Sequence, residues 1–193
     1  MKTIDDFDAD DLKKKTNDTY EILMREKRLV KQYFNEMKYY LMTSVFNNNT
    51  WEENQNYLDI AGRAEKCIYC SPIQIMKKIN HGARLFVLEM NNDLNKIVGI
   101  GLILNNFVMN KYCVYKNGNY NRFVYRGSAK ILREQMTGDE LSVMEILDGC
   151  CFKGNTHLKR GRGIQLFPVK FLLKYLDEID ILTFIMNMFK RRQ

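Results

Sequence analysis

Proline and histidine are scarce in this chain, with two of each among 193 residues. No stretch rich in glycine, serine and proline interrupts the sequence, which excludes a flexible linker between large domains. Two histidines leave few combinations for a metal site or a catalytic triad. The sequence also contains no Ser/His/Asp set, no P-loop and no cluster of metal-binding carboxylates. The length indicates one domain, or one domain with an appendage.

Long apolar runs are also missing. No segment approaches the ~20 residues of a membrane span, and the acidic stretch from Met1 to Asp11 lacks the apolar core of a signal peptide. The cysteines number five, an odd count that favours reduced thiols. These features predict an intracellular protein, cytoplasmic or nuclear, that is not secreted and does not associate with a membrane.

A Cys-x-x-Cys motif at Cys67 and Cys70 invites a zinc or redox interpretation. A second pair of cysteine or histidine residues at metal-binding spacing is absent, since Cys150 and Cys151 are adjacent and His157 is distant in sequence. The motif therefore favours buried free thiols, and we expect neither a metal nor another cofactor.

Positive charge is concentrated near the C-terminus. The net charge is +7, and residues 153–193 carry nine Lys/Arg against three Asp/Glu, whereas residues 1–50 carry nine of each. Such an asymmetry suggests a polyanion as partner, and a solvated basic face is the alternative.

Helical periodicity dominates the first quarter of the chain. Apolar residues recur at three- and four-residue spacing from about Asp10 to Phe46, which predicts one long helix or two, ending at Asn47-Asn48-Asn49. We therefore assign residues 1–50 to an N-terminal helical segment and residues 51–193 to an α+β core domain. The helical segment either packs on the core or pairs with a second copy as a homodimer.

The clearest strand signal lies in the middle of the chain. Residues 83–90 and 96–104 are apolar and rich in β-branched side chains, and the turn-forming residues 91–95 between them predict a β-hairpin. Gly99 and Gly101 leave one face of the second strand bare, which indicates a bend or a close approach by another backbone. A curved sheet or a small barrel is the simplest arrangement.

Weaker signals complete the predicted fold. Ser71-Pro72 predicts a short helix that ends at Ile79, and Asn117-Gly118 predicts a second hairpin. The capping box of Thr137 and Glu140 predicts a helix that ends at about Asp148. A last helix begins at Pro168. The predicted class is α+β, with a curved, mainly antiparallel sheet or small barrel flanked by a long N-terminal helix and a C-terminal helix.

The best functional candidate is the basic, glycine-containing loop from Thr156 to Gly163. Cations next to glycines allow both charge and backbone amides to approach an anion, so the loop predicts phosphate contacts. An ordinary solvated loop with a glycine turn is the alternative. The residues concerned are His157, Lys159, Arg160, Gly161, Arg162 and Gly163.

Two further groups extend this candidate. Along the strand that follows Asn117-Gly118, Arg122 and Arg126 share one face and would add phosphate contacts. Tyr125 on the other face and Trp51, the single tryptophan, are candidates for stacking on a base, with core packing as the alternative for each.

The segment from Lys66 to Asn105 resembles the PUA-like superfamily, in particular its EVE and ASCH branches, which are relatives of the YTH readers. The matching segments are Ile79–Gly82, Leu85–Leu88 and Ile97–Gly101, the last of which stands in Lys-Ile-Val-Gly-Ile-Gly-Leu-Ile. The resemblance implies a small curved β-barrel with flanking helices that binds RNA or DNA and sometimes holds a modified base in an aromatic pocket. It brings no catalytic residue to this chain.

A second resemblance points to an enzyme. Arg160-Gly161-Arg162-Gly163-Ile164 looks like the coenzyme A pyrophosphate loop of GNAT acetyltransferases, in which a strand leads into the loop and the loop opens into a helix. Pro168 lies where the interior of that helix would need an amide. Our leading prediction is therefore a non-enzymatic RNA- or DNA-binding protein. The alternatives are an acetyltransferase that uses acetyl-coenzyme A and a structural scaffold protein, for example of a virion.

Overall fold

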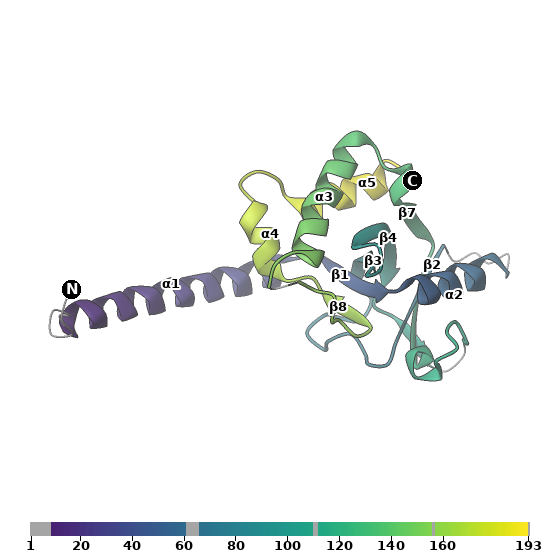
Figure 1. Cartoon of the computed structure of the whole chain (residues 1–193), viewed down its shortest axis with the longest axis horizontal. Coiled ribbons are helices and arrows are strands. Elements are labelled where there is room, and N and C mark those ends of the chain that lie inside the picture. Colours follow the sequence, from purple (N-terminus) through teal and green to yellow (C-terminus); the bar gives the residue numbers. More distant parts are fainter. Residues whose placement is uncertain (1–8, 61–65, 110–111, 156, 193) are drawn as a thin grey trace. The chain divides into compact units, whose positions relative to one another are not determined.

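The computed structural model describes residues 9–60, 66–109, 112–155 and 157–192, with side chains of the first helix described from residue 21 onward (Figure 1). The helices are α1 (Ala9–Glu36), α2 (Asn48–Asp59), α3 (Gly138–Phe152), α4 (Val169–Tyr175) and α5 (Ile181–Lys190), and two 3₁₀ turns are η2 (Gly118–Asn121) and η3 (Arg133–Gln135). The strands are β1 (Tyr39–Phe46), β2 (Cys67–Ser71), β3 (Arg84–Asn91), β4 (Lys96–Leu104), β5 (Phe107–Met109), β6 (Phe123–Gly127), β7 (Ala129–Leu132) and β8 (Ile164–Leu166).

The chain divides between Met37 and Lys38 into two compact units. The predicted N-terminal helix is α1, but its expected continuation to Phe46 was wrong, since residues 39–46 form β1. The boundary between the units therefore lies at residue 37 and not at residue 50. Within α1, Ile22, Leu23 and Leu29 are exposed apolar side chains, and a homodimer through this helix stays a prediction. No helix in the described ranges is long and apolar enough to cross a membrane.

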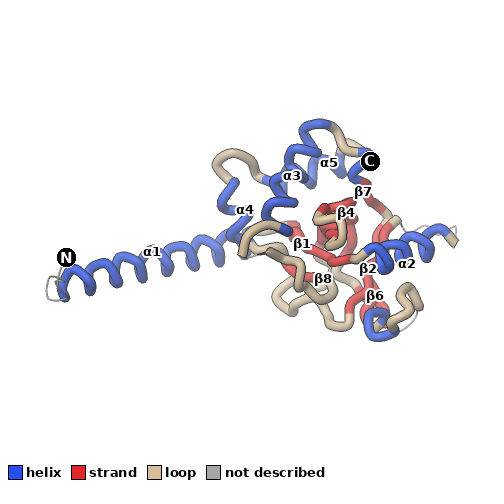
Figure 2. The backbone as a smooth tube through the Cα atoms, in the orientation of Figure 1, coloured by secondary structure: helices blue, strands red, loops and turns tan. Residues whose placement is uncertain are grey.

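Strand β1 is an inner strand of a five-stranded sheet with the order β7-β4-β3-β1-β8. Figure 2 shows β1 beside β8. It runs parallel to β3 and antiparallel to β8, and the other described pairings are antiparallel. Six of its eight residues are buried. Because neither face of β1 is left to solvent, its sequence lacks the alternation of a half-exposed strand and resembles a buried helix.

The remaining strands form a three-stranded antiparallel sheet with the order β2-β6-β5. The described strands therefore form two sheets that do not close into one barrel. The α+β class and the mainly antiparallel, curved sheet with flanking helices are confirmed. Helix α3 contacts β4, α5 contacts β1, and α2 contacts β1 and β2 (Figure 1). The predicted last helix is two helices, α4 and α5.

The central hairpin is confirmed as β3 and β4, and its two glycines are closely approached by other groups. A Cβ atom on Gly99 would overlap the Glu89 carboxylate, and one on Gly101 would overlap the Tyr69 hydroxyl. The bare face of β4 thus accommodates two buried polar side chains, and the backbone carbonyl of Ile131 would lie 3.2 Å from a Cβ atom on Gly99.

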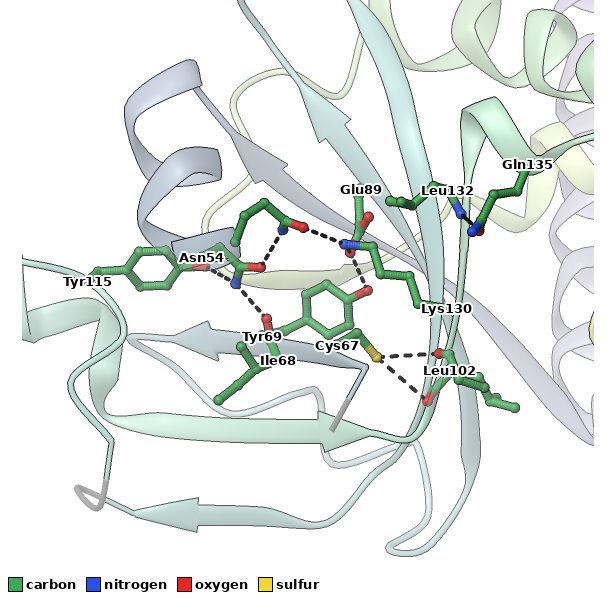
Figure 3. A network of polar contacts seen from close by, with 12 residues as sticks. Asn54, Cys67, Ile68, Tyr69, Glu89, Leu102, Tyr115, Lys130, Leu132 and Gln135 are labelled. Atoms are coloured by element: carbon green, nitrogen blue, oxygen red, sulfur yellow. Dashed lines mark hydrogen bonds and ion pairs between the residues drawn. The ribbon is translucent and has the colours of Figure 1, made fainter. Parts of the chain in front are cut away.

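These side chains belong to a polar network between the two sheets (Figure 3). The Tyr69 hydroxyl donates to Glu89 Oε1 at 2.8 Å, and Lys130 Nζ lies 3.1 Å from the same oxygen. Glu89 Oε2 is buried without a hydrogen-bond partner among the described groups. Burial raises the pKa of Glu89, an effect that the Lys130 ammonium opposes. Lys130 Nζ also lies 4.5 Å from the centre of the Trp51 ring.

The cysteines are free thiols, as the sequence predicted. Burial raises the pKa of Cys67 and of Cys70 to about 12, so both stay protonated near neutral pH. The described residues contain no cluster of three side chains suited to hold a metal ion.

Two local predictions were wrong. Residues 72–83 form turns and irregular loop where we expected a helix, because the Ser71 hydroxyl bonds the backbone of Ile73 in a tight turn and does not cap a helix. Asn117-Gly118 does not close a hairpin. Asn117 instead caps η2, and β6 pairs with β2 and β5.

Candidate nucleic-acid interface

The described part of the basic loop, residues 157–163, is held in place by backbone contacts. The Leu158 amide donates to the Cys151 carbonyl at 2.8 Å, which ties the loop to the end of α3. The Asn92 side-chain amide donates to the Lys159 carbonyl at 2.9 Å, which ties it to the turn between β3 and β4. The loop is therefore a fixed feature of the surface, and it leads directly into β8.

Gly163 fixes the end of this loop. Its φ of +66° lies in the left-handed region that favours glycine, and a Cβ atom there would overlap the Ser71 hydroxyl and approach Pro72 Cδ to 3.4 Å. The basic loop consequently lies directly against the end of β2.

Arg162 meets Arg122 in one surface hollow of about 610 Å³, which we call the arginine hollow. The two arginines come from segments forty residues apart in the sequence, and both are exposed. The other described residues that line this hollow are uncharged: Pro72, Asn117, Gly118, Asn119 and Tyr120. An anion in this hollow would lie beside two arginines, whose guanidinium groups suit bidentate binding of phosphate.

A second hollow of about 490 Å³ adjoins the first, and we call it the glycine hollow. Gly161 and Gly163 line it on either side of Arg162, and Asn117 and Tyr120 line both hollows. Its remaining described lining comes from the end of β1, the start of α2, the segment before η2, strand β2 and the turn between β3 and β4. It includes Ser44, Asn47, Thr50, Glu53, Tyr115, Lys116, Cys70 and Asn92. This lining offers hydrogen-bond donors and acceptors beside an aromatic ring.

Buried asparagines shape the wall that the two hollows share. Asn121 accepts from the amides of Val114 and Tyr115 and donates to the Tyr115 carbonyl at 2.7 Å. Asn54 of α2 donates to the Tyr115 hydroxyl at 3.1 Å and to the Ile68 carbonyl at 2.8 Å. These bonds satisfy the backbone of the segment without a hairpin ladder, and they place Tyr120 and Arg122 at the surface.

We predicted from the sequence that a helix ends at Asn47-Asn48-Asn49, but helix α2 begins there. Asn47 is an N-cap: its side chain accepts from the Thr50 amide at 2.8 Å, and Thr50 Oγ1 accepts from the Asn47 amide at 3.0 Å. This reciprocal cap brings both residues to the rim of the glycine hollow.

The other cations of the basic loop do not line either hollow. Lys159 is half-buried, and its Nζ lies 6.0 Å from the centre of the Phe152 ring. Arg160 is exposed. His157 is half-buried, with Nδ1 buried and unpaired among the described groups. Thr156 lies outside the described residues. Of the predicted loop residues, the geometry brings Arg162, Gly161 and Gly163 together.

Three predicted site residues outside the basic loop, Arg126, Trp51 and Tyr125, lie in different surroundings. Arg126 is exposed but lines a separate hollow with Leu104 and Phe107, and its guanidinium lies 5.2 Å from the Tyr112 ring centre. Trp51 is half-buried, with its ring in edge contact with Phe46 at 5.3 Å and beneath Lys130.

Tyr125 is fully buried, so the prediction that it stacks on a base was wrong. Its hydroxyl accepts a hydrogen bond from the Ile75 amide at 3.1 Å. The exposed aromatic side chain at the site is Tyr120, at 38% exposure, which sequence reasoning missed. Tyr120 follows directly on a turn-forming Asn-Gly-Asn stretch, and an aromatic residue in a polar turn was the available signal.

No family model, curated protein or solved structure matches this chain. The two hollows and the residues that line them are therefore the observations that bear on its function.

Proposed function

We propose that this protein binds RNA or DNA, with Arg122 and Arg162 as the principal phosphate contacts. The observation that carries the proposal is that these two arginines, from distant segments, line one hollow whose other described lining is uncharged. A phosphodiester there would not meet a competing carboxylate from the residues that line it. The net charge of +7 supports a polyanion as partner.

The glycine hollow supplies the second half of the proposal. A base attached to a phosphate in the arginine hollow would reach the glycine hollow by passing Tyr120, which borders both hollows. Gly161 and Gly163 contribute backbone to the wall of the glycine hollow. Tyr120 would then take the stacking role that we predicted for Tyr125. Lys159 and Arg160 would extend the basic surface outward.

The PUA-like resemblance fits this proposal, and acetyl transfer ranks below it. The basic loop leads into β8, and α4 begins only at Val169, whereas the resemblance to GNAT acetyltransferases implies a loop that opens into a helix. A scaffold role stays a prediction that rests on the exposed apolar residues of α1.

The test is a fluorescence-anisotropy titration with single- and double-stranded RNA and DNA at several salt concentrations. Because each neutralised phosphate releases counterions, Arg122→Ala/Arg162→Ala should weaken binding and reduce the slope of log K against log salt by ~2. The control is Lys170→Ala/Lys174→Ala, which removes the same charge from exposed positions on α4. The control should bind nearly as wild type does.

Two results would contradict the proposal. One is absence of salt-dependent binding by the wild-type protein. The other is an equal loss in both double variants, which would attribute binding to net charge and not to the arginine hollow. Binding of acetyl-coenzyme A in calorimetry, without binding of nucleic acid, would favour the acetyltransferase alternative.

A further inference from the structure

We propose that residues 72–78, which we call the 72–78 loop, contact the bases that flank the phosphates bound in the arginine hollow. Ile73 and Met76 would provide this contact. The inference rests on the proposed function, because it adds an apolar component to the same interface.

The 72–78 loop exposes two large apolar side chains. Ile73 is 55% exposed and Met76 is 43% exposed. Lys77 and Lys78 directly after them are exposed as well. Single exposed apolar residues are common on protein surfaces, but two beside two lysines on one short loop form a tip with apolar and cationic groups together.

The backbone that carries this tip is fixed. The fully buried Ser71 hydroxyl accepts from the Ile73 amide at 3.3 Å and donates to the Ile73 carbonyl at 2.5 Å. Farther along, the Ile75 amide donates to the Tyr125 hydroxyl at 3.1 Å, and the Ile75 side chain is buried. The backbone that carries Ile73 and Met76 is thus ordered on either side of a buried anchor, so little backbone entropy is lost when they make a contact.

The start of the 72–78 loop borders the arginine hollow. Pro72, the neighbour of Ile73 in the chain, lines that hollow together with Arg122 and Arg162. Gly163 lies against Ser71 and Pro72, so the basic loop and the 72–78 loop border each other. A nucleic acid whose phosphates lie in the arginine hollow would therefore bring its neighbouring bases to Ile73.

The apolar faces of nucleic-acid bases suit contact with Ile73 and Met76. Apolar side chains such as isoleucine and methionine insert at base steps beside phosphates held by cations in many architectural proteins. This contact adds affinity through buried apolar area, which depends little on salt, whereas the arginine contacts depend strongly on salt. The two contributions can consequently be measured separately.

The experiment compares wild-type protein with Ile73→Ser/Met76→Ser. The probes are 2-aminopurine-labelled RNA and DNA duplexes, titrated at several salt concentrations. We expect binding to weaken by about 10-fold at every salt concentration, with an unchanged salt slope. The rise in 2-aminopurine fluorescence that accompanies unstacking should be lost. Leu104→Ser is the matched control, since Leu104 is 46% exposed and lines a different hollow.

The outcomes separate this inference from the proposed function. Salt-dependent binding that Ile73→Ser/Met76→Ser leaves unchanged, or that Leu104→Ser weakens equally, would overturn the base contact and leave the arginine interface standing. A changed salt slope in the serine variant would also overturn it. No binding by wild-type protein, either to these duplexes or to single-stranded RNA and DNA, would overturn both. Because all three side chains are exposed, thermal melts should show that each variant folds.

Discussion

Gly163 of the basic loop lies against Ser71 at the end of β2, so closely that any side chain at position 163 would overlap the Ser71 hydroxyl. The backbone of Gly163 also has a φ of +66°. One glycine therefore sets the position of the basic loop relative to the sheet of β2, β5 and β6.

Gly163→Ala should destabilise the protein by ~3 kcal/mol, since the substitution adds backbone strain and a clash with a buried group. It should also displace Arg162 and weaken nucleic-acid binding. Gly154→Ala is the matched control, because Gly154 has a φ of +76° but no atom near its Cβ position. The control should lose only about 1 kcal/mol and keep its affinity. Urea unfolding and anisotropy measure the two effects, and equal losses in both variants would refute the assigned contact.

The contacts of Glu140 predict that the folded protein loses stability in acid. Hydrogen bonds from Arg192, with smaller contributions from the Thr137 amide and Arg191, lower the pKa of Glu140 from 4.5 to about 2. A carboxyl with a folded pKa below its unfolded pKa stabilises the fold above the unfolded pKa, and this stabilisation is lost as pH falls. The free energy of unfolding should thus decrease between pH 4.5 and pH 2.

Glu140→Gln isolates this charge effect, because a glutamine oxygen can still accept from the Thr137 amide, as Glu140 does at 3.0 Å. At pH 7 the variant should be less stable than wild type, and the difference should vanish toward pH 2. Urea unfolding at a series of pH values measures it. A difference that stays constant from pH 7 to pH 2 would show that Arg192 does not hold the ionised form.

Because Glu89 and Lys130 form a buried pair, we expect the losses of stability caused by substituting each of them not to be additive. Lys130→Met leaves a carboxylate in the core and should cost ~3–5 kcal/mol, and Glu89→Leu should cost a similar amount by leaving the ammonium unpaired. The double variant should recover most of this loss, since it leaves no unpaired charge. Urea unfolding followed by Trp51 fluorescence is suited to the measurement, because Lys130 lies over the Trp51 ring. Additive losses would contradict direct pairing.

Local signals sufficed for much of the fold. The hairpin of β3 and β4 follows from two apolar runs and a turn, and α3 follows from the capping box of Thr137 and Glu140, which the structure contains. Each of these elements is specified by residues close together in the sequence, so the pattern alone determines its type.

The misplaced elements depend on distant partners. Strand β1 takes its form from β3 and β8, and no nearby residue distinguishes it from a helix. The segment before η2 is held by Asn121 and by Asn54 of α2, which the dipeptide Asn117-Gly118 does not reveal. For the candidate site, sequence alone identified Arg122 and Arg162 but not that they meet, since their meeting requires this segment to take its observed path.

The pairing of β1 with β8 has a consequence for how the protein is made. Residues 39–46 are synthesised well before one of their two partner strands, which consists of residues 164–166. Until those residues emerge, β1 has an unpaired edge rich in apolar side chains, which is the kind of surface that aggregates. The nascent chain should therefore depend on chaperones until residues 164–166 have emerged.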